Sequence, residues 1–217
     1  MTEIITETIE DTAAPEIKLA CATRNRGKIT ELKDLLADTD ITLMTWRDFA
    51  PVGHIEETGK TFAENAIIKA ATTAKILGVP ALADDSGLIV RALNNAPGVY
   101  SARYASDDAS DWDNLQKVLH EMRGVTDRRA AFKCFIAIAR PDGEAITFGG
   151  SCDGAIAPRP RGSSGFGYDP IFLCGPFLRQ TFAELTDNEK NLISHRAKAL
   201  GSMYRHLDRV RAFLNYE

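Results

Sequence analysis

The chain has 217 residues, of which 44 % are hydrophobic and 26 % are charged, as in globular proteins with a substantial core. Its formal charge of −4 provides no general attraction to nucleic acid or to a membrane surface, so neither partner is expected. A phosphate-bearing ligand would therefore need a local basic pocket. No stretch approaches the length of a membrane-spanning helix, and the four cysteines form no C-x-x-C pair, which favours reduced thiols in a cytoplasmic protein.

Residues 1–16 carry five acidic side chains and no Lys or Arg. This composition is opposite to that of a signal peptide and predicts a disordered acidic tail. Residues 17–217 show no internal repeat and no change in composition, so we expect them to form a single domain.

The first half of that domain alternates strands and helices. Apolar runs at 17–22 and 41–45 predict strands, and the apolar spacing from Ile29 to Leu36 predicts a helix between them. An Ala-rich segment at 61–77 predicts a longer helix that ends at Gly78. A short strand at 81–83 is expected to run straight into the Asp-Asp-Ser-Gly segment at 84–87, with another strand piece at 88–90 and a loop at 94–105.

The second half continues the alternation. Residues 111–122 predict a helix with Trp112 on its apolar side, and residues 130–139 predict a strand covered on both faces. A turn at 141–143 predicts a hairpin partner at 144–152. A capping box at 186–189 predicts a helix start, and one helix is expected from Leu200 to Leu214. The pattern favours an α/β fold.

Four polar clusters are candidates for chemistry, and the first is the loop from Thr23 to Lys28. It lies where a strand ends and a helix begins, so backbone N–H groups at the helix start could bind phosphate beside the Lys28 ammonium. The alternative interpretation is an ordinary capped helix start with solvated basic side chains.

The second cluster is Asp84-Asp85-Ser86-Gly87. Two carboxylates that leave an apolar strand need solvent, hydrogen bonds or a cation, and one or two carboxylates suffice for Mg²⁺ because this ion keeps several waters. An ionised Asp can also accept a proton from water. Asp-Ser-Gly is equally typical of a polar turn between strands, so the segment alone leaves both interpretations open.

The third cluster is Gly165-Phe166-Gly167-Tyr168-Asp169-Pro170, where glycines beside aromatic residues could expose a ring for stacking on a nucleobase. A hairpin loop with core aromatics is the alternative. The fourth cluster runs from Lys190 to Arg196. Its basic side chains could bind phosphate or a base carbonyl, whereas His195 alone is more typical of a structural histidine.

Taken together, these clusters resemble the inosine triphosphate pyrophosphatase family, the non-canonical purine nucleoside triphosphate pyrophosphatases. The resemblance runs from about residue 17 to about residue 213. The segments that carry it are TRNRGK at 23–28, EETG at 56–59, FAENA at 62–66, ADDSGL at 83–88, PGVYSARY at 97–104, GFGYDP at 165–170, EL at 184–185 and SHR at 194–196.

The resemblance implies a central mixed, twisted sheet with helices and two lobes that flank a deep nucleotide-binding cleft. It also implies a homodimer that requires Mg²⁺ and hydrolyses ITP, dITP and XTP to a nucleoside monophosphate and pyrophosphate. Water would attack the α-phosphate, with Asp85 as the proton acceptor, and the metal site would consist of Glu56 and Asp85. Asp84 would be a supporting carboxylate.

The resemblance implies substrate contacts at several further positions. The triphosphate-binding loop would comprise Thr23, Arg24, Asn25, Arg26, Gly27 and Lys28. Lys69 would be a second phosphate contact, and Ser86, which follows Asp85, would be a further substrate contact. The base platform would comprise Phe166, Gly167, Tyr168 and Asp169, and the wall that recognises the purine edge would comprise Lys190, His195 and Arg196. Many relatives carry Gly at the position of Arg24, so we expect altered loop packing there.

Two other functions fit parts of the pattern. A pyrophosphatase for other modified nucleotides, such as methylated pyrimidines, would use the same phosphate chemistry. A regulatory nucleotide-binding module would not need a carboxylate pair for metal and water, so Glu56, Asp85 and Lys28 favour an enzyme.

Overall fold

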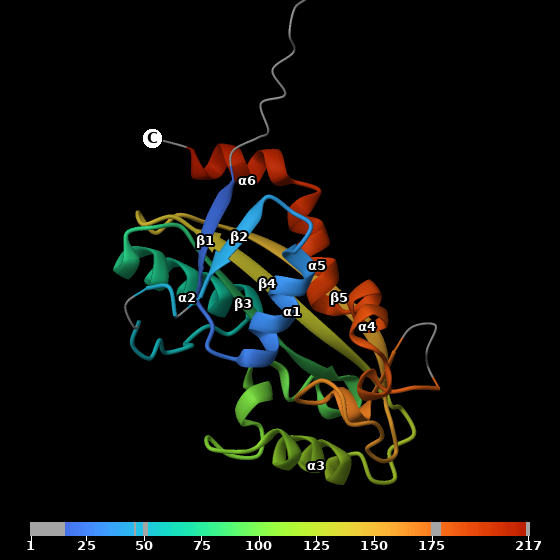
Figure 1. Ribbon diagram of the computed structural model, residues 1–217. Helices are drawn as coiled ribbons and strands as arrows, with labels where there is room; N and C mark the ends of the chain where they lie inside the picture. The colour runs from blue at the N-terminus through green and yellow to red at the C-terminus, as the bar shows by residue number, and fades with distance from the viewer. Residues whose placement is uncertain (1–15, 46, 50–51, 175–178, 216–217) are drawn as a thin grey trace, which may run out of the picture.

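The computed structural model describes residues 16–45, 47–49, 52–174 and 179–215, and the predicted acidic tail lies almost entirely outside them. A six-stranded mixed sheet crosses the molecule in the order β2-β1-β3-β4-β5-β6 (Figure 1). The two pairs that involve β1 are parallel and the other pairs are antiparallel. The strands are β1 (Ile17–Cys21), β2 (Ile41–Met44), β3 (Ala81–Val90), β4 (Arg129–Ala139), β5 (Ala145–Ile156) and β6 (Phe172–Cys174). The expected α/β fold with a mixed sheet is confirmed.

Helices pack on both faces of this sheet because its strands are apolar on both sides. Helix α2 (Phe62–Leu77) contacts one face through Ala66, Ala70 and Ala74, which meet alanines of β3 and β4. Small side chains on both partners let the helix approach the sheet closely. Thr61 caps its start with a capping box, and Gly78 ends it in a left-handed conformation, as the sequence predicts.

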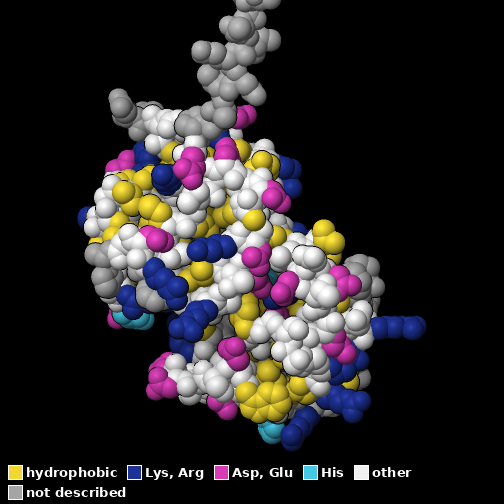
Figure 2. Space-filling view, in the orientation of Figure 1, with side chains coloured by type: hydrophobic (Ala, Val, Ile, Leu, Met, Phe, Trp, Pro, Cys, Tyr) yellow, Lys and Arg dark blue, Asp and Glu magenta, His cyan; other side chains and the backbone are white. Residues whose placement is uncertain are grey.

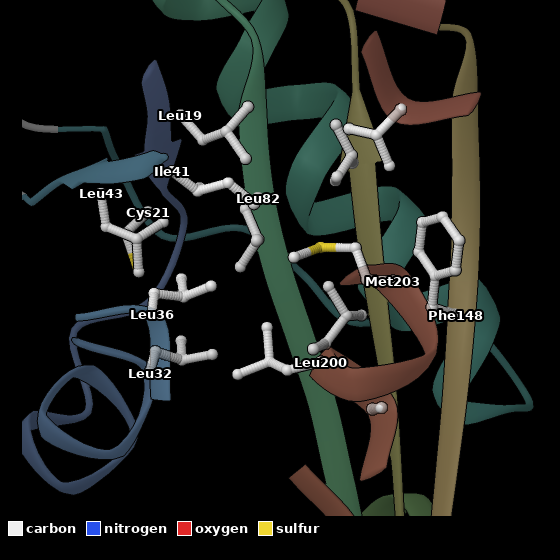
Figure 3. Packing of buried hydrophobic residues seen from close by; sticks show 14 of the residues in the cluster. Leu19, Cys21, Leu32, Leu36, Ile41, Leu43, Leu82, Phe148, Leu200 and Met203 are labelled. Atoms are coloured by element: carbon white, nitrogen blue, oxygen red, sulfur yellow. The ribbon is translucent and has the colours of Figure 1, made fainter. Parts of the chain in front are cut away.

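The opposite face carries helices α1 (Arg26–Leu36), α5 (His195–Tyr204) and α6 (Leu207–Leu214). Their apolar side chains form one cluster with the strands, in which Leu32 and Leu36 of α1 lie toward Leu82 and Leu200 (Figure 3). A second cluster lies at the other end of the same face. It joins β3 and β4 to helix α3 (Asp111–Glu121), to β6 and to the 3₁₀ turns at Asp169–Ile171 and Phe182–Glu184.

The alternative of a polar turn at Asp-Asp-Ser-Gly is wrong, because the two expected strand pieces form one continuous strand, β3, from Ala81 to Val90. It pairs with β4 along its whole length, from Ala81 opposite Ala139 to Val90 opposite Ala130. Basic side chains contact both carboxylates within this strand, so the acidic pair needs no turn or solvent.

The prediction of a single helix from Leu200 to Leu214 is also wrong, since the helix is interrupted at His206, between α5 and α6. The ring Nδ1 of His206 lies 2.8 Å from the Ser202 carbonyl oxygen, the acceptor that the His206 N–H would use in a continuous helix. Trp112 is 57 % exposed instead of packing on the apolar side of α3. The predicted loop at 94–105 contains a 3₁₀ helix at Gly98–Arg103.

The helix start predicted from the capping box at 186–189 is confirmed. Helix α4 (Asp187–Ile193) begins at the capping box of Thr186 and Glu189. No helix within the described part of the chain is long and apolar enough to cross a membrane.

Candidate functional site

The candidate site lies where β3 continues past the end of its neighbour. Strand β1 pairs with β3 only through Ala20 and Cys21, and the last contact is the Ala22 N–H to the Leu82 carbonyl at 2.8 Å. Beyond this point the edge of β3 has no β1 partner, and a cavity of about 420 Å³ opens there. Figure 2 shows Lys and Arg side chains close to Asp and Glu side chains in the middle of this hollowed face.

Most predicted site residues line this cavity. They are Thr23, Arg24, Asn25, Lys28, Lys69, Asp85, Ser86, Phe166, Gly167, Tyr168, Asp169, Lys190, His195 and Arg196. Among the described residues that line the cavity, Arg26, Gly27 and Glu56 are absent.

Asp84 and Asp85 point to opposite faces of the sheet because side chains alternate along a strand. Asp85 faces α2, where Oδ1 accepts from Lys69 Nζ at 2.9 Å and Oδ2 accepts from Asn65 Nδ2 at 3.3 Å. Burial raises the pKa of the Asp85 carboxyl, although the charges of Lys69 and Lys28 oppose the shift. Asp85 therefore lies in the cavity wall as a buried carboxylate that is paired with the Lys69 ammonium.

Asp84 faces α1 and α5 and is buried behind the cavity wall. Its Oδ2 lies 3.1 Å from Lys28 Nζ and 3.0 Å from Arg196 Nη2. Burial alone would raise the pKa of this carboxyl, but the charges of Lys28 and Arg196 outweigh burial and hold the pKa below its ordinary value. Asp84 is thus a permanently ionised partner of two basic side chains.

The predicted triphosphate loop is the N-terminus of α1. Asn25 caps the helix by accepting from Lys28 N at 3.1 Å, and Thr23 Oγ1 accepts from Asn25 N at 3.2 Å. The Arg24 guanidinium donates to the Val52 carbonyl and so joins this loop to the segment after β2. The altered loop packing expected at Arg24 relative to other family members stays a prediction.

Phe166 is held at one wall of the cavity by its own loop and by α1. Asp169 Oδ2 accepts from the Phe166 N–H at 2.9 Å, and a Cβ on Gly27 would come within 2.7 Å of the ring. The backbone of Gly27 therefore packs closely against the Phe166 ring, although Gly27 does not line the cavity. The ammonium of Lys190 lies 5.0 Å from the ring centroid and the Arg196 guanidinium lies 5.8 Å from it.

Tyr168 and Gly167 bind their loop to neighbouring segments. The Tyr168 hydroxyl donates to the Ser101 carbonyl at 2.7 Å and is buried, so it fixes the loop more than it presents a ring. Gly167 N–H donates to Asp111 Oδ2 at the start of α3, at 2.8 Å.

His195 begins α5 and is buried against Phe132, whose ring is stacked on the imidazole at a centroid distance of 4.7 Å. Burial and the nearby charges of Arg196 and Lys190 hold the pKa of His195 well below its ordinary value, so the imidazole is neutral. Its Nδ1 is buried and has no hydrogen-bond partner among the described residues. The structure thus leaves a polar ring atom unpaired in a side chain that lines the cavity.

Glu57 lines the cavity together with Asp85, whereas the predicted Glu56 does not. Glu57 Oε1 lies 3.3 Å from Lys69 Nζ, the same ammonium that contacts Asp85, whereas Glu56 is exposed. Lys69 therefore marks a point at which two carboxylates share one cation. The assignment of Glu56 as a metal ligand stays a prediction.

Glu31 and Asp111 are contacts that the sequence did not reveal. Glu31 on α1 accepts from Lys190 Nζ at 2.5 Å and pairs with the Arg196 guanidinium. Glu31 follows Lys28 by one helical turn, which is a local signal, but its partners come from the other end of the chain. Asp111 resembles any acidic residue in the first turn of a helix, so its contact with Gly167 has no local signal.

The amino-acid sequence is similar to a known family and to named relatives. The family model described as "Ham1 family" matches residues 19–206. The chain is 51 % identical over 185 residues to the dITP/XTP pyrophosphatase of Desulfotalea psychrophila, covering 85 % of this chain and 82 % of that one. It is 47 % identical over 197 residues to the dITP/XTP pyrophosphatase of Syntrophobacter fumaroxidans, covering 91 % and 84 % of the two chains.

A solved structure agrees with these sequence matches. The structure of a HAM1 protein from Coxiella burnetii superposes with a TM-score of 0.80 at 46 % identity, and the match covers 89 % of this chain and 99 % of that chain. Because sequence and structure match over nearly the whole described chain, this chain belongs to the Ham1 family.

Proposed function

We propose that this chain hydrolyses non-canonical purine nucleoside triphosphates, such as ITP, dITP and XTP, to the nucleoside monophosphate and pyrophosphate. The observation that carries the proposal is the single cavity that joins Asp85, the Lys28 loop, the Phe166 ring and the Arg196 wall. The relatives named dITP/XTP pyrophosphatase give the same substrate class. The two hydrophobic clusters on either side of this cavity are proposed to be the cores of the two lobes that flank a nucleotide cleft.

In the proposed reaction, the oxygen of a water molecule attacks the α-phosphorus while the bond from that phosphorus to the bridging oxygen of the β-phosphate breaks. Pyrophosphate leaves, and Asp85 accepts the proton of the water. Lys28 and Lys69 bind the phosphate oxygens and place the α-phosphate close to this carboxylate. A positioned base contributes roughly 10²- to 10⁴-fold to such a rate, and oriented charges contribute much of the rest.

The donor set in the cavity fits Mg²⁺. Asp85 and Glu57 offer hard oxygen donors on both sides of the cationic position that Lys69 Nζ holds. Mg²⁺ is usually bound through one or two carboxylates, because it keeps several waters. The described residues contain no group of three or more His, Cys, Asp or Glu side chains that could hold a metal ion. Asp85 would hold Mg²⁺ together with Glu57 or Glu56, and the bound ion would offset negative charge on the phosphates.

Base selectivity follows from unpaired polar groups. A purine with a carbonyl at C6 can accept from Arg196 or Lys190, whereas adenine presents an amine there and leaves these donors unpaired. Arg196→Ala is therefore expected to lower the dITP-over-dATP ratio of kcat/KM. An unchanged ratio would show that Arg196 does not recognise the base.

The decisive experiment is a panel of ITP, dITP, XTP, dATP, dUTP and m⁵UTP assayed for monophosphate and pyrophosphate. We expect purine substrates with a C6 carbonyl to be hydrolysed fastest, EDTA to stop the reaction, and Asp85→Asn to lower kcat by at least about 100-fold. Asp107→Asn, an exposed position outside the cavity, is the matched control. Full activity in Asp85→Asn would refute the mechanism, and faster turnover of m⁵UTP would favour a pyrimidine substrate.

The active form is proposed to be a homodimer, because the sequence resembles the inosine triphosphate pyrophosphatase family, for which a homodimer is expected. Sedimentation equilibrium at assay concentrations tests this assembly, and a monomeric mass would exclude it.

A further inference from the structure

A single buried carboxylate oxygen lies between two functional parts of the cavity. Lys28 stands at the triphosphate loop, and Arg196 stands at the base wall beside Phe166. Both side chains line the cavity, whereas Asp84 does not and is 1 % exposed. Asp84 therefore contacts both basic residues from behind and does not itself meet a ligand in the cavity.

All described polar contacts of the Asp84 side chain involve the same atom, Oδ2. It lies 3.1 Å from Lys28 Nζ, and it accepts from Arg196 Nη2 at 3.0 Å and from Arg196 Nε at 3.3 Å. Ser86 Oγ donates to it at 3.3 Å. The other oxygen, Oδ1, is buried and has no partner among the described residues. The ammonium and the guanidinium thus share one acceptor oxygen.

We propose that Asp84 is a positioning residue that couples phosphate binding by Lys28 to base recognition by Arg196. The proposal rests on the proposed function, because it assigns the two basic residues to opposite ends of a nucleoside triphosphate. When Lys28 contacts the phosphate chain and Asp84 together, it offsets part of the charge of the carboxylate and leaves Arg196 oriented toward the base. Without the Lys28 ammonium, the carboxylate attracts Arg196 more strongly and draws it away from the base. The orientation of Arg196 toward the base therefore depends on the Lys28 ammonium.

This coupling has a consequence that a purely structural carboxylate would not produce. Removing the charge of Lys28, a residue of the phosphate loop, should change the preference between bases. The change should require Asp84, since residues in one hydrogen-bonded network show non-additive effects.

The test is a double-mutant cycle on the full-length chain. We expect Lys28→Met to lower kcat/KM for both dITP and dATP and also to lower the dITP-over-dATP ratio by about three- to tenfold. Asp84→Asn should lower the ratio as well. Adding Lys28→Met to Asp84→Asn should then leave the ratio within about twofold of the single variant.

Lys69→Met is the matched control, because Lys69 is another cavity lysine whose contacts are Asp85 and Glu57. It should lower kcat/KM for dITP and dATP by the same factor. Lys28→Arg, which keeps the charge, should restore most of the ratio lost in Lys28→Met. Near-ultraviolet circular dichroism shows whether each variant is folded at the assay temperature.

Several outcomes would overturn the coupling. Equal losses of kcat/KM for dITP and dATP in Lys28→Met would overturn it, even if Asp84→Asn fails to fold. An equal change of the dITP-over-dATP ratio in Lys28→Met and Lys69→Met would also overturn it. For variants too slow for kinetics, the dissociation constants of dITP and dATP provide the same ratio. A wild-type chain that releases no pyrophosphate from dITP would refute the proposed function instead, so the two failures are distinguishable.

Discussion

Asp84 and Asp85 are chemically identical neighbours whose environments differ because the strand presents them to opposite faces. Asp84 contacts two basic side chains in the interior, and these contacts hold its pKa below the ordinary value. Asp85 lines the cavity, where burial raises its pKa. The same residue type thereby provides a fixed counter-charge on one face and a candidate proton acceptor on the other.

The two adjacent glutamates before α2 provide a matched test of the metal site. Glu57→Gln is expected to raise the Mg²⁺ concentration needed for half-maximal activity and to lower kcat by about tenfold or more. The reason is that Glu57 and Asp85 both contact the Lys69 ammonium, so both carboxylates lie close to one cationic position. Glu56→Gln, at an exposed position, should change both quantities less. Mg²⁺ titrations of pyrophosphate release measure the difference. A larger effect in Glu56→Gln would restore the ligand predicted from the sequence.

His195 predicts a pH dependence of stability. Its folded pKa lies well below the unfolded value of about 6.5, so below that pH the unfolded chain binds a proton that the folded chain does not. The free energy of unfolding should therefore fall as pH decreases, by about 1 kcal/mol between pH 7 and pH 5.5 from this group alone. Urea denaturation at both pH values of the wild type and of His195→Gln checks this. An equal pH dependence in both proteins would contradict it.

At the scale of elements, local signals predicted most helices and strands. The capping box at Thr61 and the left-handed Gly78 bound α2 as the sequence indicates, because these interactions involve only nearby residues. The continuity of β3 was not predictable from local patterns. Asp84 and Asp85 resemble a turn until their basic partners on α1, α2 and α5 are known.

The absence of a side chain at Gly150 lets the backbone of α5 pack closely against the sheet. A Cβ at this position would overlap the His195 carbonyl oxygen and the Ala199 nitrogen, which are backbone atoms of α5. Gly150→Ala should therefore lower the free energy of unfolding by about 3 kcal/mol and reduce dITP hydrolysis, since α5 carries His195 and Arg196.

Gly149→Ala is the control on the same strand. Its Cβ would meet only the edge of the Phe135 ring, at 3.0 Å, on the other face of the sheet. Urea denaturation compares the two variants. Similar midpoints would show that close packing at Gly150 does not hold α5.

At the scale of the whole molecule, the candidate site combines segments that are far apart in the sequence. Lys190 and Glu31 are separated by 159 residues and still form a partly buried pair at 2.5 Å. Residue types and order were sufficient to select residues most of which line the cavity. Contacts such as Glu31 with Arg196 depend on how α1 and α5 pack, which no local pattern encodes.

Ligand binding is expected to stabilise the whole chain. A non-hydrolysable dITP analogue with Mg²⁺ should raise the free energy of unfolding by about 2.7 kcal/mol at one hundred times its dissociation constant, because only the folded chain has the cavity. EDTA should remove most of this gain, and the matching dATP analogue should give less at equal concentration. Thermal denaturation followed by circular dichroism measures all three, and a gain insensitive to EDTA would argue against a metal in the site.

The uninterrupted pairing of β3 with β4 also constrains how the length of this segment can vary. Inserting or deleting one residue between Ala81 and Asp84 would exchange the faces of the two carboxylates, so that each would meet the helices of the other. A change of two residues would preserve the faces. Gaps in an alignment of this strand are therefore expected in even numbers, even where individual side chains vary.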